Sequence, residues 1–562
     1  MIITESELQQ LLVSAKVLDE KQFAEIQNYC RNANLPLFRV LVREKNVITD
    51  EKLGELIAAY IKLPYVRLTK QSIPQNVLQL VPETFSRRQK VVPFARTEQS
   101  VRIAFADPRN PDLIAMLQKK IGCQIEVFYA TDQDIADVHH LYKKDLQKAV
   151  NKMLVKAAHL SNSKNFESVS VIKIVDMIID YAYQDKASDI HMEPQEENFL
   201  IRYRIDGILH DVLFLPKSLQ ERILTRIKVL SRLRTDEHLA AQDGKIRTKI
   251  LDEYLDIRVS IIPIVDGEKV VMRLLTSQND QLSLSDLGMS QADLQKLTNA
   301  FNKSYGMILS TGPTGSGKST TIYAILRILN VREKNITTIE DPVEYRVKGL
   351  NQIQVNQKTN LTFAQGLRSI LRQDPNIVFV GEIRDTETAG IAVNAALTGH
   401  LVFSTLHTND APTALPRLTD MKVEPFLVAS TVSVIVAQRL VRKICNSCRT
   451  AIGISRQELL KNIPEDVVKK YFGNSKDIEL FYGKGCKICH QSGYFGRMGV
   501  YEVLEVTREI RRLIIQKADS DVILDQARKE GMTTMLEDGI DKAKRGVTTL
   551  EEVLRVTKTE NV

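Results

Sequence analysis

The chain has no tryptophan, and aromatic residues make up only 6% of its 562 residues. Proteins that move along single-stranded nucleic acid stack bases on aromatic side chains and follow the backbone with basic grooves. Here 77 basic and 69 acidic residues are spread along the sequence without a long Lys/Arg block. We therefore expect no nucleic-acid partner, and a mixed, solvated surface explains the net charge of +8.

Long apolar runs are missing too. The stretch "FLVASTVSVIVA" at 426–437 is well short of the roughly 18 to 20 residues that span a bilayer. The N-terminus carries acidic "TESE", where a secretory signal would be basic. We therefore expect a cytosolic protein, and its length predicts three or four domains.

Cysteine is scarce, and two of the six cysteines, Cys30 and Cys123, are isolated. The others form two Cys-x-x-Cys pairs: Cys445, Cys448, Cys486 and Cys489. Four thiolates are the closed tetrahedral ligand set of structural Zn²⁺, so we predict one zinc ion. Disulfides or a redox pair are the alternative, less suited to a reducing compartment. His490 adjoins the second pair and could compete as a ligand.

Changes in periodicity divide the chain. Helical spacing at the start gives way to strand-like runs such as "KVVPFA", and this pattern predicts an N-terminal domain at 1–145. A basic, mixed stretch at 146–168 is the expected linker. A small α+β domain at 169–277 and a larger domain at 278–562 follow, the latter with a cysteine subdomain at 440–495.

The larger domain alternates helical stretches with the apolar runs "GMILSTG", "NITTIED", "NIVFVGEI" and "LVFSTLHT". This alternation predicts an α/β fold with a largely parallel sheet flanked by helices. The first run leads into "GPTGSGKS", which fits the phosphate-loop pattern G-x-x-x-x-G-K-[ST].

Such a loop binds a nucleotide because its backbone N–H groups converge on phosphate oxygens at a helix N-terminus. Lys318 would neutralise the outer phosphates, and the Ser319 hydroxyl would ligate Mg²⁺. We predict ATP contacts along the whole loop: Gly312, Pro313, Thr314, Gly315, Ser316, Gly317, Lys318, Ser319 and Thr320.

Hydrolysis also requires carboxylates near the metal and the attacking water. The strand "NIVFVGEIRD" ends in Glu382, with Gly381 where most such sites place an aspartate. We expect Glu382 to meet the waters of the magnesium ion. In "TTIEDPVEY", Glu344 is the preferred water-activating base, and Glu340 is the alternative.

Two histidines bracket the strand "LVFSTLHT". His407 follows the strand and could sense the γ-phosphate, whereas His400 precedes it and is the weaker candidate. A lone histidine is usually a packing or surface residue, and this alternative applies to both.

The motifs "IEDPVEY", "VGEIRD", "GHLVFSTLHTNDA", "SDIHMEP" and "RYRIDG", with the phosphate loop and the four cysteines, resemble the secretion ATPase superfamily over residues 170–562. Within it, the long N-terminal region, the cysteines and "GYFGRMGVYEVLEV" most resemble type IV pilus assembly (extension) ATPases. Type II secretion ATPases share these features and are the alternative. Retraction ATPases lack the N-terminal region and the cysteines.

The resemblance implies a RecA-like ATPase domain with a preceding small α+β domain, assembled as a homohexamer with ATP between the catalytic and small domains. By position, Arg258 and Arg273 resemble the arginine fingers of the family, and Arg202 and Arg204 are weaker candidates. A guanidinium suits this task because it neutralises charge that develops on the γ-phosphate. Without the resemblance, surface ion pairs would be the simpler explanation of these arginines.

Two stretches depart from the family pattern. Where the family has Pro-Gln-Asp-Gly-Arg, this chain has Ala241 and Lys245, so that arginine is absent. Some N-terminal domains of the family bind cyclic di-GMP through an Arg-Leu-Gly start and a Gln end, but here Leu37, Arg39 and Tyr60 replace Arg, Gly and Gln. We therefore predict a docking module rather than a cyclic di-GMP sensor.

By resemblance, the expected function is a motor at the cytoplasmic face of the bacterial inner membrane. It would hydrolyse ATP and drive pilin polymerisation through a polytopic inner-membrane platform protein. The N-terminal domain would dock a cytoplasmic alignment component of the pilus.

Overall fold

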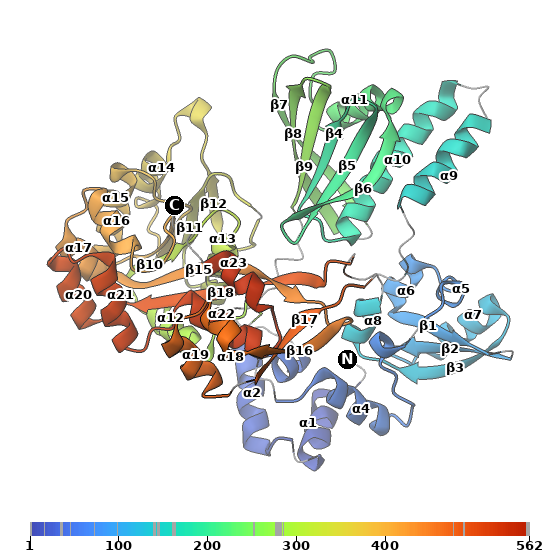
Figure 1. Ribbon diagram of the computed structural model, residues 1–562, viewed down its shortest axis with the longest axis horizontal. Coiled ribbons are helices and arrows are strands. Elements are labelled where there is room, and N and C mark those ends of the chain that lie inside the picture. Colours follow the sequence, from blue (N-terminus) through green and yellow to red (C-terminus); the bar gives the residue numbers. More distant parts are fainter. Residues whose placement is uncertain are drawn as a thin grey trace. The chain divides into compact units, whose positions relative to one another are not determined.

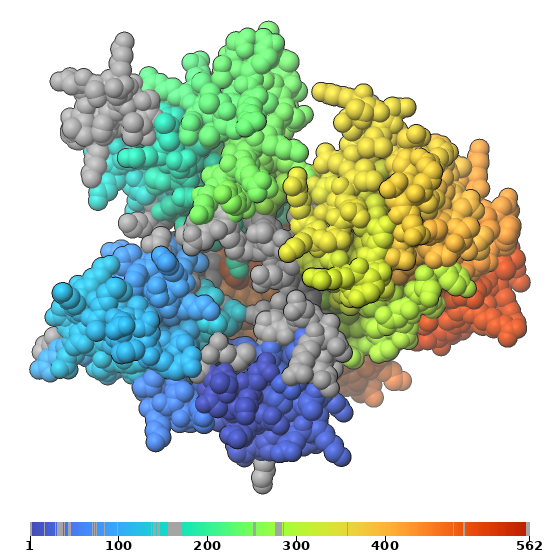
Figure 2. All heavy atoms as spheres, turned by 180° about the vertical axis from the view of Figure 1, so that it is seen from behind, coloured from blue at the N-terminus to red at the C-terminus, as the bar shows by residue number. Residues whose placement is uncertain are grey.

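The computed structural model of the chain forms two compact units, Met1–Ser277 and Gln278–Val562 (Figure 1). Figure 2 shows their atoms from behind, the first unit in blue to green and the second in yellow-green to red. The structure describes residues 3–557 except 16, 34–36, 45–46, 72, 98, 139–141, 143–145, 160–163, 251–252, 276–283, 285, 345, 476, 487–488 and 490. Among the helices it describes, none is both long and apolar enough to cross a membrane.

The first unit begins with a helical bundle. Its elements are α1 (Glu5–Ser14), α2 (Glu20–Ala33), α3 (Leu37–Arg39), η1 (Val40–Glu44) and α4 (Asp50–Tyr60). Thr4 starts α1 with a reciprocal capping box to Glu7, and the Thr49 hydroxyl caps α4. Leu8, Leu12 and Phe23 are buried between these helices and form their common core.

A small α+β layer follows the bundle. Its three-stranded sheet has the order β1-β2-β3, from β1 (Val91–Arg96), β2 (Ser100–Phe105) and β3 (Gln124–Tyr129). The flanking helices are η2 (Leu68–Lys70), α5 (Gln75–Leu78), α6 (Glu83–Gln89), α7 (Pro111–Ile121) and α8 (Asp132–Val138). The predicted change from helical to strand periodicity is therefore confirmed.

The rest of this unit is a six-stranded antiparallel sheet in the order β6-β5-β4-β9-β8-β7. The strands are β4 (Asp189–Pro194), β5 (Asn198–Ile205), β6 (Ile208–Pro216), β7 (Gln242–Ile250), β8 (Glu253–Ile264) and β9 (Gly267–Leu275). One face packs its alternating apolar side chains, such as Ile190 and Tyr203, against α9 (Leu146–His159), α10 (Lys164–Gln184) and α11 (Gln220–Leu230). A short η4 (Lys217–Leu219) precedes α11.

The stretch 146–168, expected as a linker, instead contains α9 and the start of α10. Leu146 and Val150 are buried in the core beneath the six-stranded sheet, and Met153 and Leu154 pack against that core. The many lysines of this stretch hide an apolar stripe of helical spacing, and this stripe explains the difference.

The second unit contains a seven-stranded sheet in the order β12-β11-β13-β14-β10-β15-β18. Six strands are parallel and β18 is antiparallel to β15, so the predicted parallel α/β sheet is confirmed. The strands are β10 (Gly306–Thr311), β11 (Ile336–Glu340), β12 (Asn351–Gln354), β13 (Ile377–Val380), β14 (Leu401–Leu406), β15 (Val432–Ile444) and β18 (Tyr494–Glu505).

Helices cover both faces of this sheet (Figure 1). One face packs against α12 (Gln291–Phe301) and α13 (Lys318–Leu329). The other packs against α14 (Phe363–Ile370), α15 (Thr386–Leu397), α16 (Ala414–Asp420), α17 (Pro425–Thr431), α20 (Arg508–Ile515) and α21 (Ser520–Lys529). The sheet is therefore buried on both sides, as is typical of a largely parallel sheet.

An insertion separates β15 from β18. It consists of the hairpin β16 (Arg449–Ser455) and β17 (Asp477–Gly483) with α18 (Arg456–Leu460) and α19 (Glu465–Phe472). Its apolar residues pack on Ile540 of α22 (Met535–Lys544), which is followed by α23 (Leu550–Thr557).

Candidate nucleotide site

The phosphate loop joins the end of β10 to the start of α13. Gly312, Gly315 and Gly317 have φ angles of 142°, 79° and 90°, which glycine adopts without strain. The buried Lys318 ammonium donates to the carbonyl oxygens of Gly312 (2.7 Å) and Pro313 (3.1 Å). The loop therefore closes around the lysine that the sequence analysis assigns to the outer phosphates.

The remaining loop residues are arranged for an anion. Pro313, Thr314 and Gly315 are exposed, and Ser319 and Thr320 are half-buried in the first turn of α13. The first N–H groups of a helix have no partner within the helix and carry a partial positive charge. This turn can therefore bind phosphate, and the expectation that the Ser319 hydroxyl ligates magnesium stays a prediction.

Glu382 follows β13 and is 9% exposed. One carboxylate oxygen is 2.7 Å from a terminal guanidinium nitrogen of Arg384, and the other is 3.2 Å from Nε2 of His407. Burial lowers the pKa of Lys318, and the negative charge of Glu382 opposes this effect. The strands β13, β14 and β10 are parallel and adjacent in the sheet. The structure therefore brings Lys318, Glu382 and His407 to the carboxyl ends of neighbouring strands, which we call the carboxyl edge of the sheet.

The two glutamates of "TTIEDPVEY" have different surroundings. Glu340 is buried, accepts hydrogen bonds from Tyr323 and Thr338 and is 3.4 Å from Nε2 of Gln352. Burial raises the pKa of the Glu340 carboxyl. Glu344 lies four residues beyond the strand and is half-buried. The structure thus places Glu340 in a buried hydrogen-bond network, and the choice of Glu344 as the water-activating base, with Glu340 as the alternative, stays a prediction.

His400 lies at the opposite edge of the sheet, just before β14 begins. Its Nδ1 is 3.0 Å from the carbonyl oxygen of Ala395 in α15, and its own carbonyl oxygen accepts from the N–H of Gly306. His400 therefore ties the helix end to the start of β10, a packing role rather than contact with the γ-phosphate.

The candidate arginines lie on the polar face of the six-stranded sheet. Directly paired positions form a row across five strands: Arg204, Asp189, Arg273, Arg258 and Lys245. Paired residues of an antiparallel sheet share a face, so this row holds four cations and one carboxylate. Nε of Arg273 is 3.0 Å from Asp189, yet its side chain is 61% exposed. The weaker candidate Arg202 is 2.6 Å from Glu193.

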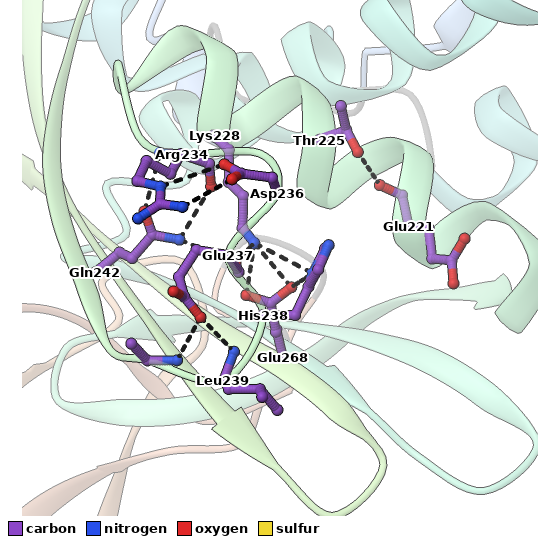
Figure 3. A network of polar contacts seen from close by, with 11 residues as sticks. Glu221, Thr225, Lys228, Arg234, Asp236, Glu237, His238, Leu239, Gln242 and Glu268 are labelled. Atoms are coloured by element: carbon purple, nitrogen blue, oxygen red, sulfur yellow. Dashed lines mark hydrogen bonds and ion pairs between the residues drawn. The ribbon is translucent and has the colours of Figure 1, made fainter.

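The loop before β7, which contains the departure at Ala241, is held by a polar network (Figure 3). The buried Lys228 ammonium is 2.7 Å from Glu268 and donates to the carbonyl oxygen of Glu237 (2.6 Å). The Glu237 carboxylate accepts the N–H groups of Leu239 and Ala240. The loop is therefore ordered without the arginine of the family pattern, and Lys245 lies in register with Arg258.

The four cysteine sulfurs form a compact cluster where β15 ends and β18 begins: Cys445, Cys448, Cys486 and Cys489. Three of the Sγ–Sγ distances are 3.6, 3.8 and 3.9 Å. Zn–S bonds of about 2.3 Å in a tetrahedron place sulfurs about 3.8 Å apart, so the cluster fits Zn²⁺. His490 lies outside the described residues.

Backbone groups favour a thiolate in this cluster. The N–H groups of Cys486 and Gly493 donate to the Cys489 sulfur at 3.1 and 3.3 Å. Burial raises the pKa of the Cys489 thiol, but these two backbone hydrogen bonds, together with hydrogen bonds from the Cys486 and Cys448 thiols, outweigh burial and lower the pKa to about 7. Neighbouring N–H donors are a common way in which proteins tune a bound metal.

In the N-terminal bundle, two of the three residues that depart from the cyclic di-GMP pattern have contacts in the structure, and the side chain of Arg39 lies outside the described part of the chain. Leu37 is part of the buried core, and the Tyr60 hydroxyl donates to Glu7 at 3.1 Å. The docking role and the expected lack of cyclic di-GMP binding both stay predictions.

Sequence analysis missed Gln438 and Arg439, which lie next to the phosphate loop and to the His407 loop respectively. The signal was a polar pair inside "VSVIVAQRLV", an otherwise apolar strand. A buried polar residue has to find partners, so such an interruption marks a site worth inspecting.

Comparisons with known proteins agree with this geometry. A family model described as type II/IV secretion system protein matches residues 164–555, and one described as the MshEN domain matches residues 61–147. The type IV pilus assembly ATPase PilB of Myxococcus xanthus is 36% identical, with 97% of this chain and 98% of that protein covered. Type II secretion system protein E of Aeromonas hydrophila is 39% identical over 88% of this chain and 99% of its own length.

The structure of the Yersinia pseudotuberculosis ATPase DotB has a similar fold, with a TM-score of 0.51 and 22% identity over 69% of this chain and 93% of that chain. The predicted fold class, a P-loop ATPase domain of the secretion type with its preceding α+β domain, is confirmed. The chain therefore belongs to the type II/IV secretion system protein family and is one of its ATPases, which use ATP and Mg²⁺.

Proposed function

We propose that this ATPase is the motor of type IV pilus extension. The meeting of Lys318, Glu382 and His407 at one sheet edge carries the hydrolytic part of the proposal. The assembly part is supported by similarity to a pilus assembly ATPase over nearly the full length of both chains, the N-terminal region included.

In the proposed reaction, the phosphate loop holds ATP and Lys318 neutralises its outer phosphates. Ser319 ligates Mg²⁺, and Glu382 accepts hydrogen bonds from the waters of that ion. Glu344 orients and deprotonates the attacking water, while His407, already beside Glu382, senses the γ-phosphate. Phosphoryl transfer depends mainly on such positioning and charge stabilisation.

Arg258 and Arg273 act as arginine fingers in this proposal. Side by side on neighbouring strands, they concentrate positive charge on an open sheet face. Asp189 orients Arg273 without neutralising the row. A rigid guanidinium stabilises charge on a transferring phosphoryl group better than a flexible ammonium does.

The motor works as a homohexamer at the cytoplasmic face of the inner membrane. ATP binds one arrangement of neighbouring subunits more tightly than another, and hydrolysis releases that preference, so the ring cycles between arrangements. A polytopic platform protein converts this motion into pilin addition. The N-terminal domain docks a cytoplasmic alignment component of the pilus.

Zinc at the four cysteines is structural in this proposal, because four thiolates leave no position open for a substrate. Bound there, the ion fixes the base of the insertion to the ends of β15 and β18.

A strain that carries Lys318→Ala at the chromosomal locus tests the function. Surface pili should disappear while secretion of folded enzymes continues, and Lys334→Ala, an exposed lysine before β11, should leave pili intact. If pili persist while secretion stops, the chain is a type II secretion ATPase, the alternative that the Aeromonas relative favours.

A further inference from the structure

Gln438 is a buried polar residue on β15, and only 1% of it is exposed. The parallel pairing of Thr311 with Ala437 places it one residue beyond the end of β10, where the phosphate loop begins. Neither the proposed reaction nor the family motifs quoted above give this side chain a role.

The amide of Gln438 joins the two sides of the phosphate loop. Its Nε2 donates to the carbonyl oxygen of Ser316 at 2.7 Å, and its Oε1 accepts from the Thr321 hydroxyl at 2.8 Å. Ser316 precedes Lys318 and Thr321 follows it in the first turn of α13. All three bonded groups are buried, where an unmet hydrogen bond is most costly.

Close packing on Gln438 also explains two glycines of the loop. A Cβ atom at Gly312 would lie 2.5 Å from the carbonyl oxygen of Gln438, and one at Gly317 would lie 3.0 Å from its Nε2. The phosphate loop therefore packs directly against Gln438, and a side chain at Gly312 would force the loop away from β15.

The same strands hold the second loop of the site. Arg439 donates to Oδ1 of Asn409 at 3.0 Å, two residues after His407. On β18, Glu502 is paired with Ala437 and accepts the N–H of Ala411 at 2.9 Å. The β15–β18 pair thus contacts both the phosphate loop and the loop that carries His407.

We infer that Gln438 is a positioning residue for nucleotide binding. Its amide fixes the loop so that the backbone N–H groups and Lys318 converge on the phosphates before ATP arrives. Without the Gln438 amide, part of the free energy of ATP binding is used to order the loop, so ATP binds more weakly. The inference rests on the nucleotide site and holds whichever assembly the motor drives.

The test uses purified full-length protein with Gln438→Ala and Thr321→Val, the second of which keeps side-chain shape. We expect the KM for ATP and the Kd for Mg-ADP to rise at least ten-fold in Gln438→Ala and about five-fold in Thr321→Val. Ser433→Ala, which removes a buried hydroxyl at the far end of β15, is the matched control and should leave both constants unchanged.

A purely structural role would lower the melting temperature and the active fraction, and hence kcat, with KM and Kd unchanged in the folded protein. That result would overturn the inference. Because the two side chains share one hydrogen bond, the double variant should bind Mg-ADP no worse than Gln438→Ala alone. Fully additive losses would also contradict the inference.

If Gln438→Ala does not fold, Thr321→Val and Gln438→Glu decide the question. The glutamate keeps the acceptor for Thr321 but places a carboxylate oxygen against the Ser316 carbonyl, so its Kd should exceed that of Thr321→Val. Kd values within two-fold of wild type in both would overturn the inference. These readouts are independent of pili, so their failure is distinct from failure of the proposed function.

Discussion

The two large sheets of this chain use charge in opposite ways. The antiparallel sheet of the first unit spreads Arg204, Arg273, Arg258 and Lys245 across one open face, aligned by strand register. The parallel sheet of the second unit is buried on both faces and gathers Lys318, Glu382 and His407 at the ends of its strands.

The difference teaches where each kind of sheet can place chemistry. A face that is free of helices tolerates a row of long cations because their heads stay solvated. A sheet covered on both sides places charged groups at lowest cost beyond its strand ends, where loops and helix N-termini meet. In our account, the groups at the strand ends of the parallel sheet bind and cleave ATP. The arginines on the open face of the antiparallel sheet stabilise the charge that develops on the γ-phosphate.

The largest effect should come from Glu382, at the strand ends of the parallel sheet. Glu382→Gln keeps the shape of the side chain but removes the charge, so kcat should fall about 1,000-fold while the Kd for ATP changes only a few-fold. Steady-state hydrolysis and calorimetric binding measure the two constants. Glu387→Gln, an exposed glutamate on α15, is the control. A kcat within ten-fold of wild type would remove Glu382 from the mechanism.

The arginine row on the face of the antiparallel sheet should give the next largest effect. Arg273→Ala should lower kcat about 100-fold, and Arg273→Lys should recover little of it because a lysine lacks the planar fork. Arg222→Ala, an exposed arginine on α11, tests whether any arginine of this unit has the same effect. Equal losses in both variants would mean that the row on the sheet face has no special role.

The metal centre should affect stability more than catalysis. Cys489→Ser should reduce the zinc content from one ion per chain to none and lower the melting temperature by about 10 °C, with ATP affinity within three-fold of wild type. Elemental analysis and calorimetry measure these changes, and Cys123→Ser is the control. Full zinc content in Cys489→Ser would contradict the four-thiolate site.

The smallest effect should be a pH dependence of stability that comes from Glu502 on β18. Burial raises the pKa of Glu502 from its ordinary 4.5 to about 7. The folded state therefore holds this proton more tightly than the unfolded chain. The free energy of unfolding should fall by about 3 kcal/mol as pH rises from 4.5 to 7 and stay low above that.

Glu502→Gln should remove this dependence. Between pH 5.5 and 8, the melting temperature of wild type should fall about 5 °C more than that of the variant. Glu505→Gln, which replaces an exposed glutamate at the end of β18, should behave like wild type. Parallel melting curves for Glu502→Gln and wild type would show that Glu502 is ionised throughout this range.

The sequence predicted the nucleotide site at the strand ends of the parallel sheet better than the arginine row on the face of the antiparallel sheet. A parallel sheet places the ends of its strands together, so "GPTGSGKS", Glu382 and His407 could be assembled from strand order alone. The row of arginines depends on which strands pair and in what register, and no local pattern reveals that Arg258 faces Arg273. Their role came from family resemblance alone.

Three further features depend on contacts that the sequence does not show. Sequence analysis preferred Glu344 to Glu340, but only the structure shows that Glu340 is buried beside Tyr323. Gln438 is far from the phosphate loop in sequence, and its contacts exist only because β15 lies beside β10. The helix α9 was hidden because its lysines outweighed a narrow apolar stripe.

The most direct test of the account is specific ATPase activity measured against protein concentration, with oligomeric state followed by light scattering in the same samples. We predict negligible turnover from monomers and a steep rise in activity per chain as hexamers form, since neighbouring copies have to act together on each nucleotide. Constant activity per chain down to concentrations where only folded monomers remain would contradict the account.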